Sequence, residues 1–509
     1  MGCGLRFWQL ARFNTLVFDE VYFVQFAQDY LSASPSFDAH PPLGKYWIAA
    51  GIWLHHWLPS RALGASLPAV ASAAVGYRWM NALAGSCVPL VVMGLAHTVC
   101  KQSIAATSIA QPAAKSTDIP AAKPATENAF TTSQANRLKT FTLLSGAFVA
   151  IDGLFVVESR YGLINIYMVL LGLLGLWLWL RREETTDTQT RNRLGVLAGV
   201  CLGGAIATKW NGLGFVLSLL LWDLFRTGAH WRNKAYWENR AYWKNRTRWE
   251  KRDIWATKER VSFSTALLRK AALTRLIPFL FYVGLISSVT YTLAWLPHLW
   301  LTQNSFFAVH SSLLSFHQQL PSDGHSACSQ WFTWPLLIKP IAYWYEVKNG
   351  AAYTVNNMGN PVLWWLSSAA ILLMVLDKIT ALARTISKGV YAWATPKQTL
   401  TPTAAPAPLI ANSIITFCLI GYGANWLPWL LVQRCTFIYL YMPAAVFSFM
   451  GLAWVISGWL HSRISWVRLM GWVMIVAIAL AFIFWLPLSI GSPLSTESLQ
   501  IRWWLKSWI

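Results

Sequence analysis

The sequence of 509 residues contains little charge. Asp, Glu, Lys and Arg together make up 12% of it, whereas about 25% is usual for a soluble globular domain. Hydrophobic residues account for 55% of the chain, and the mean hydropathy is +0.41. The low charge argues against a soluble cytosolic protein, and the high apolar content excludes disorder for most of the chain.

Acidic residues and paired cysteines are also scarce. The chain has 20 Asp and Glu residues and 41 Lys and Arg residues, which gives a net charge of +21. Such an excess is typical either of nucleic-acid binding or of the cytoplasmic loops of a membrane protein. The seven cysteines are scattered without a CxxC pair, so we predict no metal or redox cluster and expect most of them to act as small apolar side chains.

Long apolar runs are abundant instead. A helix that spans a bilayer needs about 20 mostly apolar residues, and the 32 Trp residues fit the aromatic belts of membrane proteins. The sequence predicts an all-α polytopic membrane protein with about ten transmembrane helices. They are expected over residues 76–99, 140–158, 160–180, 194–208, 211–225, 276–297, 361–376, 409–431, 437–457 and 469–489.

The basic residues predict how these helices are oriented. The loops that follow the odd-numbered helices hold 29 of the 41 Lys and Arg residues, and positive charge favours the cytoplasmic side. Residues 101–139 are expected to form a cytoplasmic low-complexity linker, and residues 226–275 a cytoplasmic basic and aromatic loop. That loop could bind RNA or anionic lipid, but a solvated segment that anchors the topology fits a membrane chain better, and we expect no nucleic-acid partner.

The outer face then holds the N-terminal segment, the loop 298–360 and the C-terminal tail. Residues 18–47 read FDEVYFVQFAQDYLSASPSFDAHPPLGKYW and contain four acids, among them the adjacent pair Asp19 and Glu20. Burial near lipid raises the pKa of a carboxylate and makes it a better base. Alternatively, these acids cap helices or pair with Lys45.

Six motifs in order resemble the protein O-mannosyltransferase family, whose members are multispanning glycosyltransferases of the GT-C class. The resemblance covers nearly the whole chain and is closest to bacterial members, since loop 298–360 has no room for a MIR domain. The motifs are FDEVYF (18–23) with HPPLGK (40–45), YRWMNALAG (77–85), ESRYGLINIYM (158–168), TKWNGL (208–213), WFTWPLLIKPIAYWY (331–345) and QRCTFIYLYMPA (433–444).

Two positions and one helix depart from the family pattern. The usual Asp of the third motif is Asn165, and the usual His before the last Tyr of the sixth motif is Leu440. The helix that usually precedes the FDE segment is not found here, so the resemblance predicts a single transmembrane domain, residues 1–509, without that helix.

The resemblance implies an inverting transfer of mannose from polyprenyl-phosphate-mannose to Ser and Thr hydroxyls of exported proteins. The reaction would take place on the outer face of the plasma (inner) membrane, with the secretion machinery as a possible partner. Related GT-C enzymes use a lipid or glycan acceptor, and this alternative stays open. A transporter is disfavoured, because no internal duplication is seen.

This chemistry needs a base and cations for the departing phosphate. Asp19 is predicted to be the base, and Glu20 to orient acceptor or sugar, in the outer catalytic segment 13–60. Donor phosphate is predicted to bind the cations at the outer helix ends, which are Arg78, Arg160, Lys209 and Arg434; snorkelling or pairing of Arg160 with Glu158 or Asp19 is the alternative.

Other polar and aromatic residues of the outer face are candidates for acceptor or sugar binding. They are His40, Lys45, His317, Trp334 and Tyr343, although His40 also suits a turn and the aromatic residues also suit an interfacial belt. No cofactor is firmly implied beyond the lipid-linked donor. The outer face shows no HxH, HxxxH or DxD pattern, so no metal ligand is assigned. A divalent ion bound by Asp19 together with the phosphate stays an alternative.

Overall fold

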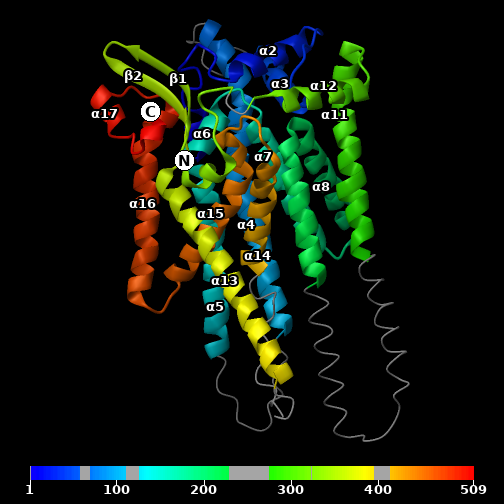
Figure 1. Ribbon diagram of the computed structural model, residues 1–509, viewed down its shortest axis with the longest axis vertical. Coiled ribbons are helices and arrows are strands. Elements are labelled where there is room, and N and C mark those ends of the chain that lie inside the picture. The colour runs from blue at the N-terminus through cyan, green and yellow to red at the C-terminus, as the bar shows by residue number, and fades with distance from the viewer. Residues whose placement is uncertain (1, 58–68, 111–124, 229–273, 322–323, 395–412) are drawn as a thin grey trace, which may run out of the picture.

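A computed structural model shows long helices that run side by side between two ends of the molecule (Figure 1). It describes residues 2–57, 69–110, 125–228, 274–321, 324–394 and 413–509. The long helices are α4 (Ala69–Ala110), α5 (Ala125–Ala150), α7 (Asn165–Glu184), α8 (Thr188–Thr208), the helix over 213–228, α11 (Ser287–Thr302), α13 (Pro361–Ala394), α14 (Ser413–Trp426), α15 (Met442–Leu460) and α16 (Ser465–Ile490).

Several of these helices are suited to cross a membrane. Within the described residues, six helical stretches are long and apolar enough to span, and α5 with α6 (Gly153–Arg160) makes a seventh if this bent pair counts as one span. All ten predicted segments lie on helical elements where they are described, and residues 409–412 lie outside the described part. The prediction of a polytopic helical membrane protein is confirmed.

The predicted helices over 140–158 and 160–180 are interrupted. The chain bends by 58° between α5 and α6, and α7 begins only at Asn165. Asp152 causes the bend, because its side chain accepts hydrogen bonds from the backbone N–H groups of Phe155 and Asn360 and from the indole of Trp364. A new N-cap therefore replaces the continuing helix, and α6 turns toward the outer end.

Small residues bring neighbouring helices close together. A Cβ atom on Gly172 of α7 would lie 2.1 Å from the ring of Phe215, and one on Gly175 would lie 2.7 Å from Leu202 of α8. Glycine at such positions allows the backbones of two helices to approach closely. Close van der Waals packing of this kind drives helix association in lipid, where the hydrophobic effect does not. The predicted linker 101–139 is helical at both ends, since residues 101–110 continue α4 and residues 125–139 begin α5.

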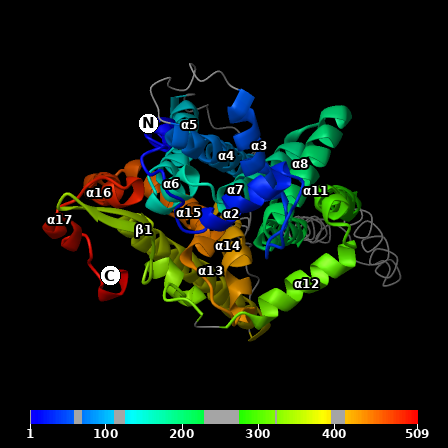
Figure 2. The ribbon, with the colours of Figure 1, turned by 90° about the horizontal axis from the view of Figure 1, so that it is seen from above.

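The short elements gather at one end of the helical bundle. Figures 1 and 2 show α2 (Glu20–Leu31), α3 (Leu43–Trp57), α12 (Phe306–Gln319) and a β-hairpin there, with α17 (Thr496–Gln500) at its margin. We call this end the outer end. It carries the segments that the sequence places outside the membrane, with the predicted cytoplasmic segment 181–193 at the opposite end.

A short β-hairpin is added to the predicted helical architecture. β1 (Ile341–Lys348) pairs with β2 (Ala351–Asn357) in an antiparallel sheet. Asn349 and Gly350 connect them, with φ angles of 53° and 74°. An Asn-Gly pair between two runs of Tyr, Trp and Val is a strong signal for a two-residue turn, so this element could have been predicted from the sequence.

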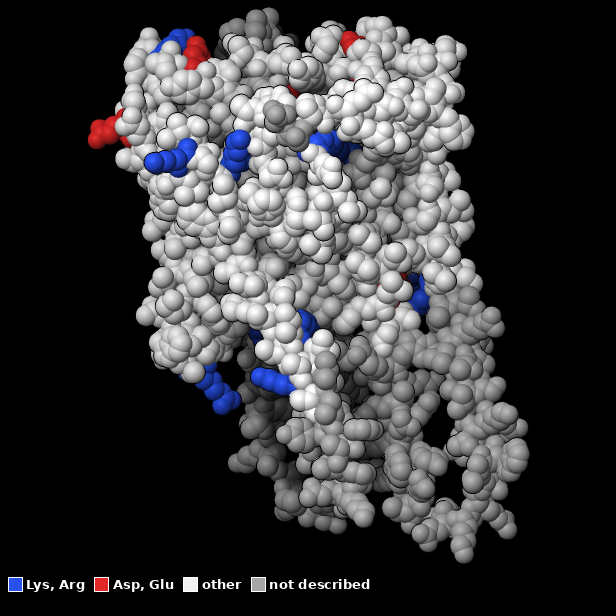
Figure 3. Space-filling model, in the orientation of Figure 1, with Lys and Arg blue, Asp and Glu red and all other residues white. Residues whose placement is uncertain are grey.

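Charged residues on the surface are concentrated toward the two ends of the molecule. Figure 3 shows a broad band without Lys, Arg, Asp or Glu between the outer end and a second group of basic residues nearer the other end. Exposed side chains on the helices that are suited to span, such as Leu293, Leu372 and Leu480, are apolar. This surface fits the hydrocarbon core of a bilayer.

A disulfide joins two segments of the outer end. Cys328, in the loop before β1, bonds to Cys435, which precedes α15. This pair is an exception to the expectation that most of the cysteines act as small apolar side chains; the other five are free. A separation of 107 residues gives no pairing signal in the sequence, so only the tertiary structure reveals the bond.

Candidate active site

Asp19 lies where the chain enters α2. Its side chain makes no capping hydrogen bond with that helix, so the carboxylate is available to other groups. Phe18 before it has a φ of 51°, a left-handed conformation that costs a non-glycine residue free energy and is common at functional sites. The ring of Phe18 stacks on Tyr343 of β1, with 4.3 Å between centroids, and this contact stabilises the turn that directs Asp19.

Glu20 has a different environment from its neighbour. Its carboxylate is fully buried and forms two hydrogen bonds with Arg78, of 2.8 and 2.7 Å. It also accepts from the backbone N–H groups of Val17 and Gly162. All four contacts hold the chain around Asp19, so the geometry favours a structural role for Glu20 over contact with acceptor or sugar.

Arg78 and Arg160 hold the N-terminal segment in place. Arg78 donates to the carbonyl oxygens of Leu10, Phe13 and Thr15 in addition to Glu20. Arg160 donates to the carbonyl oxygens of residues 5 and 8, at 2.6 and 2.7 Å. Both side chains are at most 2% exposed. In this arrangement neither guanidinium faces an open site, and the geometry favours anchoring over the predicted phosphate contact.

Lys209 belongs to the same site as Asp19. It caps the C-terminus of α8, and its ammonium group donates to Asn165 Oδ1 at 2.9 Å and lies 4.8 Å from the ring centroid of Tyr439. Its charge acts on Asp19, on Glu158 and on Arg434. Of the four cations that were predicted to bind phosphate, Arg78 and Arg160 hold the N-terminal segment, whereas Lys209 interacts with Asp19 and with Arg434.

A buried network connects Lys209 to the hairpin. Asn165 donates to Glu158 Oε2 at 3.1 Å, and Glu158 Oε1 accepts from Tyr343 at 2.7 Å and from Asn357 at 2.8 Å. Because Asn165 offers both an acceptor and a donor, it joins the Lys209 ammonium group to the Glu158 carboxylate. The amide at the position where the family usually has Asp is therefore fully used.

A second network lies beside the first. Lys45 forms an ion pair with Asp38 and donates to the carbonyl oxygen of His40 at 2.9 Å, and His40 Nδ1 lies 3.3 Å from Asp38. The His40 ring meets the His317 ring edge to face at 6.2 Å, and His317 Nε2 donates to the Ala39 carbonyl oxygen. Lys45 is buried and acts on the loop, whereas His40 and His317 are partly exposed and border the site.

Two predicted acceptor residues are inside the protein. Trp334 is fully buried and donates to Ser329 Oγ at 2.8 Å. Tyr343 is 5% exposed and donates its hydroxyl to Glu158. These positions favour a supporting role for both, Trp334 in the outer loop and Tyr343 under Phe18, rather than a lining of an acceptor groove.

The pKa values of the site suit proton transfer. Burial raises the pKa of Asp19 to about 6, against the opposing attraction of Lys209. Burial lowers the pKa of Lys209 to about 8, although Asp19 and Glu158 raise it. Burial also tends to raise the pKa of Asp38, but Lys45 and His40 outweigh it and hold this pKa well below its usual range. A raised pKa of this size suits Asp19 to the role of a general base.

Arg434 completes the cationic side. Its Nη1 donates to the carbonyl oxygen of Cys435 at 3.1 Å, and its charge acts on Lys209 and on His317, where burial and Arg434 lower the pKa to about 4. Arg434 is partly exposed, and its fork of donors suits a phosphate. His317 is therefore neutral at pH 7.

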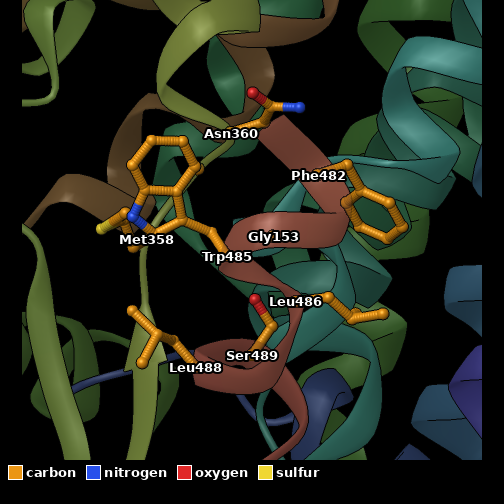
Figure 4. A pocket seen from close by; sticks show the side chains of 9 residues that line it. Gly153, Met358, Asn360, Phe482, Trp485, Leu486, Leu488 and Ser489 are labelled. Carbon is orange, nitrogen blue, oxygen red and sulfur yellow. The ribbon is translucent and has the colours of Figure 1, made fainter. Parts of the chain in front are cut away.

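A separate hollow lies away from these residues. It has about 240 Å³ of empty volume between α6, residues 358–360 and α16, as Figure 4 shows. Gly153, Met358, Asn360, Phe482, Trp485 and Ser489 are among its lining residues, and no predicted site residue is. Among the described residues, no group of three or more His, Cys, Asp or Glu side chains is arranged to hold a metal, so no ligand set can be named.

Two family descriptions match the chain and together cover most of it. "Dolichyl-phosphate-mannose-protein mannosyltransferase" matches residues 1–110 and 128–247, and "C-terminal four TMM region of protein-O-mannosyltransferase" matches residues 302–508. The chain belongs to the protein O-mannosyltransferase family. The resemblance of the six motifs is thereby confirmed.

Relatives and a solved structure agree with this assignment. A polyprenol-phosphate-mannose–protein mannosyltransferase of Mycolicibacterium smegmatis is 22% identical over 97% of this chain and 88% of its own length. The alignment with dolichyl-phosphate-mannose–protein mannosyltransferase 1 of Saccharomyces cerevisiae, 25% identical, covers 40% of this chain and only 24% of the yeast protein. The fold matches a chain of the S. cerevisiae Pmt1–Pmt2 complex with a TM-score of 0.70 at 15% identity, over 100% of this chain and 91% of that one. The GT-C fold is confirmed.

Sequence reasoning missed several members of the site. Asp38 was noted only as an acid, Glu158 only as a partner for Arg160, and Asn165 only as a departure from the family. Asn357 and Tyr439 gave no signal, because they are distant in sequence and ordinary in type. Their roles follow from the closed path of contacts between the hairpin, α6, α7 and the end of α8.

Proposed function

We propose that this protein transfers mannose from polyprenyl-phosphate-mannose to Ser and Thr hydroxyls of exported polypeptides. The observation that carries this proposal is made at the outer end. Burial raises the pKa of Asp19 there, Lys209 acts on Asp19 through its charge, and Arg434 in turn acts on Lys209. Family membership and the name of the mycobacterial relative support the donor and the acceptor class.

The reaction is a single displacement at the anomeric carbon. The acceptor hydroxyl attacks that carbon, Asp19 takes its proton, and the bond to the phosphate oxygen breaks, so the polyprenyl phosphate leaves with the electron pair. Lys209 and Arg434 stabilise the charge that develops on the phosphate. The configuration at the anomeric carbon inverts, because no second nucleophile intervenes.

The same arrangement supports a proposal for how the protein is oriented in the membrane. Asp19 and Lys209 lie at the outer end, and the described connections between α7 and α8 and between α15 and α16, which were predicted to be cytoplasmic, lie toward the other end. We propose that the outer end faces the extracytoplasmic side of the plasma membrane, where the chain would meet exported polypeptides as the secretion machinery delivers them. The apolar flank of the bundle would hold the polyprenyl tail.

The test is mannose transfer to a Ser/Thr-rich peptide by membranes that contain the wild type, Asp19→Asn or Asp29→Asn. Asp29 is the matched control, because it lies on α2 and its contacts are with Gln25 and Ser36 at the surface. We expect Asp19→Asn to lose transfer by 100-fold or more, on the order of general-base catalysis, and Asp29→Asn to keep it.

Two outcomes would contradict the proposal. Equal transfer by the wild type and Asp19→Asn would remove Asp19 from catalysis. Label that enters lipid or glycan, with none in peptide, would support the alternative acceptor class and refute the protein acceptor.

A further inference from the structure

The disulfide at the outer end is part of a larger clasp. Cys328 and Cys435 are joined with 5.2 Å between their Cα atoms. Directly after the two cysteines, the Ser329 N–H donates to the Thr436 carbonyl oxygen at 2.8 Å, and the Thr436 hydroxyl donates to the Ser329 carbonyl oxygen at 2.7 Å. The Cys435 N–H donates to the carbonyl oxygen of Pro321 at 3.0 Å. We call these contacts the outer clasp.

The outer clasp restrains the segment that carries Arg434. Residues 432–437 form no helix or strand, so regular backbone hydrogen bonds do not hold them. Arg434 directly precedes Cys435 and donates to its carbonyl oxygen. The charge of Arg434 acts on Lys209 and His317, so the same short segment that the disulfide holds also reaches the phosphate side of the site.

We propose that the Cys328–Cys435 disulfide is a positioning element for mannosyl transfer, which holds Arg434 beside Lys209 so that both meet the donor phosphate. The inference rests on the proposed function. A covalent tie to the outer loop limits the conformations open to an irregular segment, and a cation that is already in place binds phosphate without a further cost in entropy. Cys328 and Cys435 themselves touch no substrate in this scheme.

The inference makes donor binding depend on redox state. Formation of the bond removes two electrons and two protons from the thiols, which a thiol–disulfide oxidant of the extracytoplasmic space would accept. A dithiol such as dithiothreitol reverses the reaction and becomes a cyclic disulfide itself. The enzyme should therefore be fully active only where disulfides persist.

The experiment compares purified full-length wild type, the variant Cys328→Ser/Cys435→Ser and the control Cys3→Ser. Cys3 is exposed and free in the structure. We expect the KM for polyprenyl-phosphate-mannose to rise about tenfold in the double variant, the size of one lost charged contact, with a smaller change in kcat. Cys3→Ser should match the wild type.

A mutant cycle separates positioning from mere loss of structure. If the disulfide acts through Arg434, adding Cys328→Ser/Cys435→Ser to Arg434→Ala should leave the donor KM of Arg434→Ala unchanged. Multiplied effects in the triple variant, or a normal donor KM in the double variant, would overturn the proposal.

Reduction of the folded wild type covers the case in which the double variant does not fold. Dithiothreitol treatment, with alkylation of the freed thiols confirmed by mass, should raise the donor KM as the substitutions do. An unchanged KM after complete reduction would overturn the inference while leaving the proposed function intact. Absence of transfer by the oxidised wild type would instead refute the proposed function, and this inference with it.

Discussion

The ammonium group of Lys209 lies 2.9 Å from the side-chain oxygen of Asn165. This contact joins the C-terminal end of α8 to the N-terminal end of α7. Because Asn165 also donates to the buried Glu158, it fixes Lys209 without neutralising it. An ammonium group that keeps its charge beside Asp19 both limits the rise in the pKa of Asp19 and attracts the donor phosphate.

The first prediction is a bell-shaped dependence of transfer on pH. Asp19 must be ionised to accept a proton, and its pKa is about 6, so kcat/KM should fall as pH decreases below that value. Lys209 must be protonated to hold phosphate, and its pKa is about 8, so kcat/KM should fall again above it. Initial rates between pH 4.5 and 9.5 give both limbs, and a flat profile across pH 5–7 would contradict the role of Asp19.

The second prediction concerns Asn165→Asp. A carboxylate at this position adds a negative charge next to Lys209 and so raises the pKa of its ammonium group. The alkaline limb should move upward by about one pH unit, the usual size for an opposite charge at contact distance. Asn165→Leu, which removes the hydrogen bond without adding charge, is the control and should not move that limb upward. The same shift in both variants would show that Lys209 does not set the alkaline limb.

The third prediction concerns the stability of the segment that carries Asp19. Arg78→Met leaves the carboxylate of Glu20 buried without its partner, which should lower the free energy of unfolding by about 3–5 kcal/mol. Arg181→Ala is the matched control, since Arg181 is exposed and pairs with Glu184 at 3.6 Å, and it should cost about 0–1 kcal/mol. Thermal unfolding in detergent compares them. A stable Arg78→Met with a raised donor KM would instead support the phosphate role that the sequence suggested.

The fourth prediction tests the link between the hairpin and the site. Tyr343→Phe keeps the ring on which Phe18 stacks but removes the hydroxyl that donates to Glu158. We expect a loss of about 1–2 kcal/mol in stability, as for one hydrogen bond to a buried charged group, and a several-fold lower kcat/KM. Tyr345→Phe, on the same strand with its side chain exposed, should behave like the wild type. A Tyr343→Phe variant with unchanged stability and kcat/KM would show that this hydroxyl does not support the site.

Local patterns in the sequence were enough for much of the fold. Runs of about 20 apolar residues predicted where the helices lie, because a bilayer imposes that length on any single segment. The break at Asp152 and the hairpin at Asn349–Gly350 also have local causes. Both could have been predicted, because N-caps and two-residue turns depend only on neighbouring residues.

The site was predicted in its chemistry but not in its pairing. Arg78, Arg160, Lys209 and Arg434 are all cations at outer helix ends, and sequence alone gives them the same expected role. The structure separates Arg78 and Arg160, which hold backbone carbonyl oxygens, from Lys209, which interacts with both Asp19 and Arg434. The hydrogen-bond acceptors that each cation meets come from residues far apart in the chain, so its role cannot be seen from its local sequence.

The sequence by itself therefore determined the membrane class, the family motifs and the presence of acidic and cationic residues at one face, because composition and short-range spacing carry that information. Only the tertiary structure decided that Glu20 is bound by Arg78, that Asn165 bridges Lys209 and Glu158, and that Cys328 is bonded to Cys435. The physical reason is that hydrogen bonds and disulfides form where the packed helices and loops bring two groups within about 3 Å, and no local pattern records that distance.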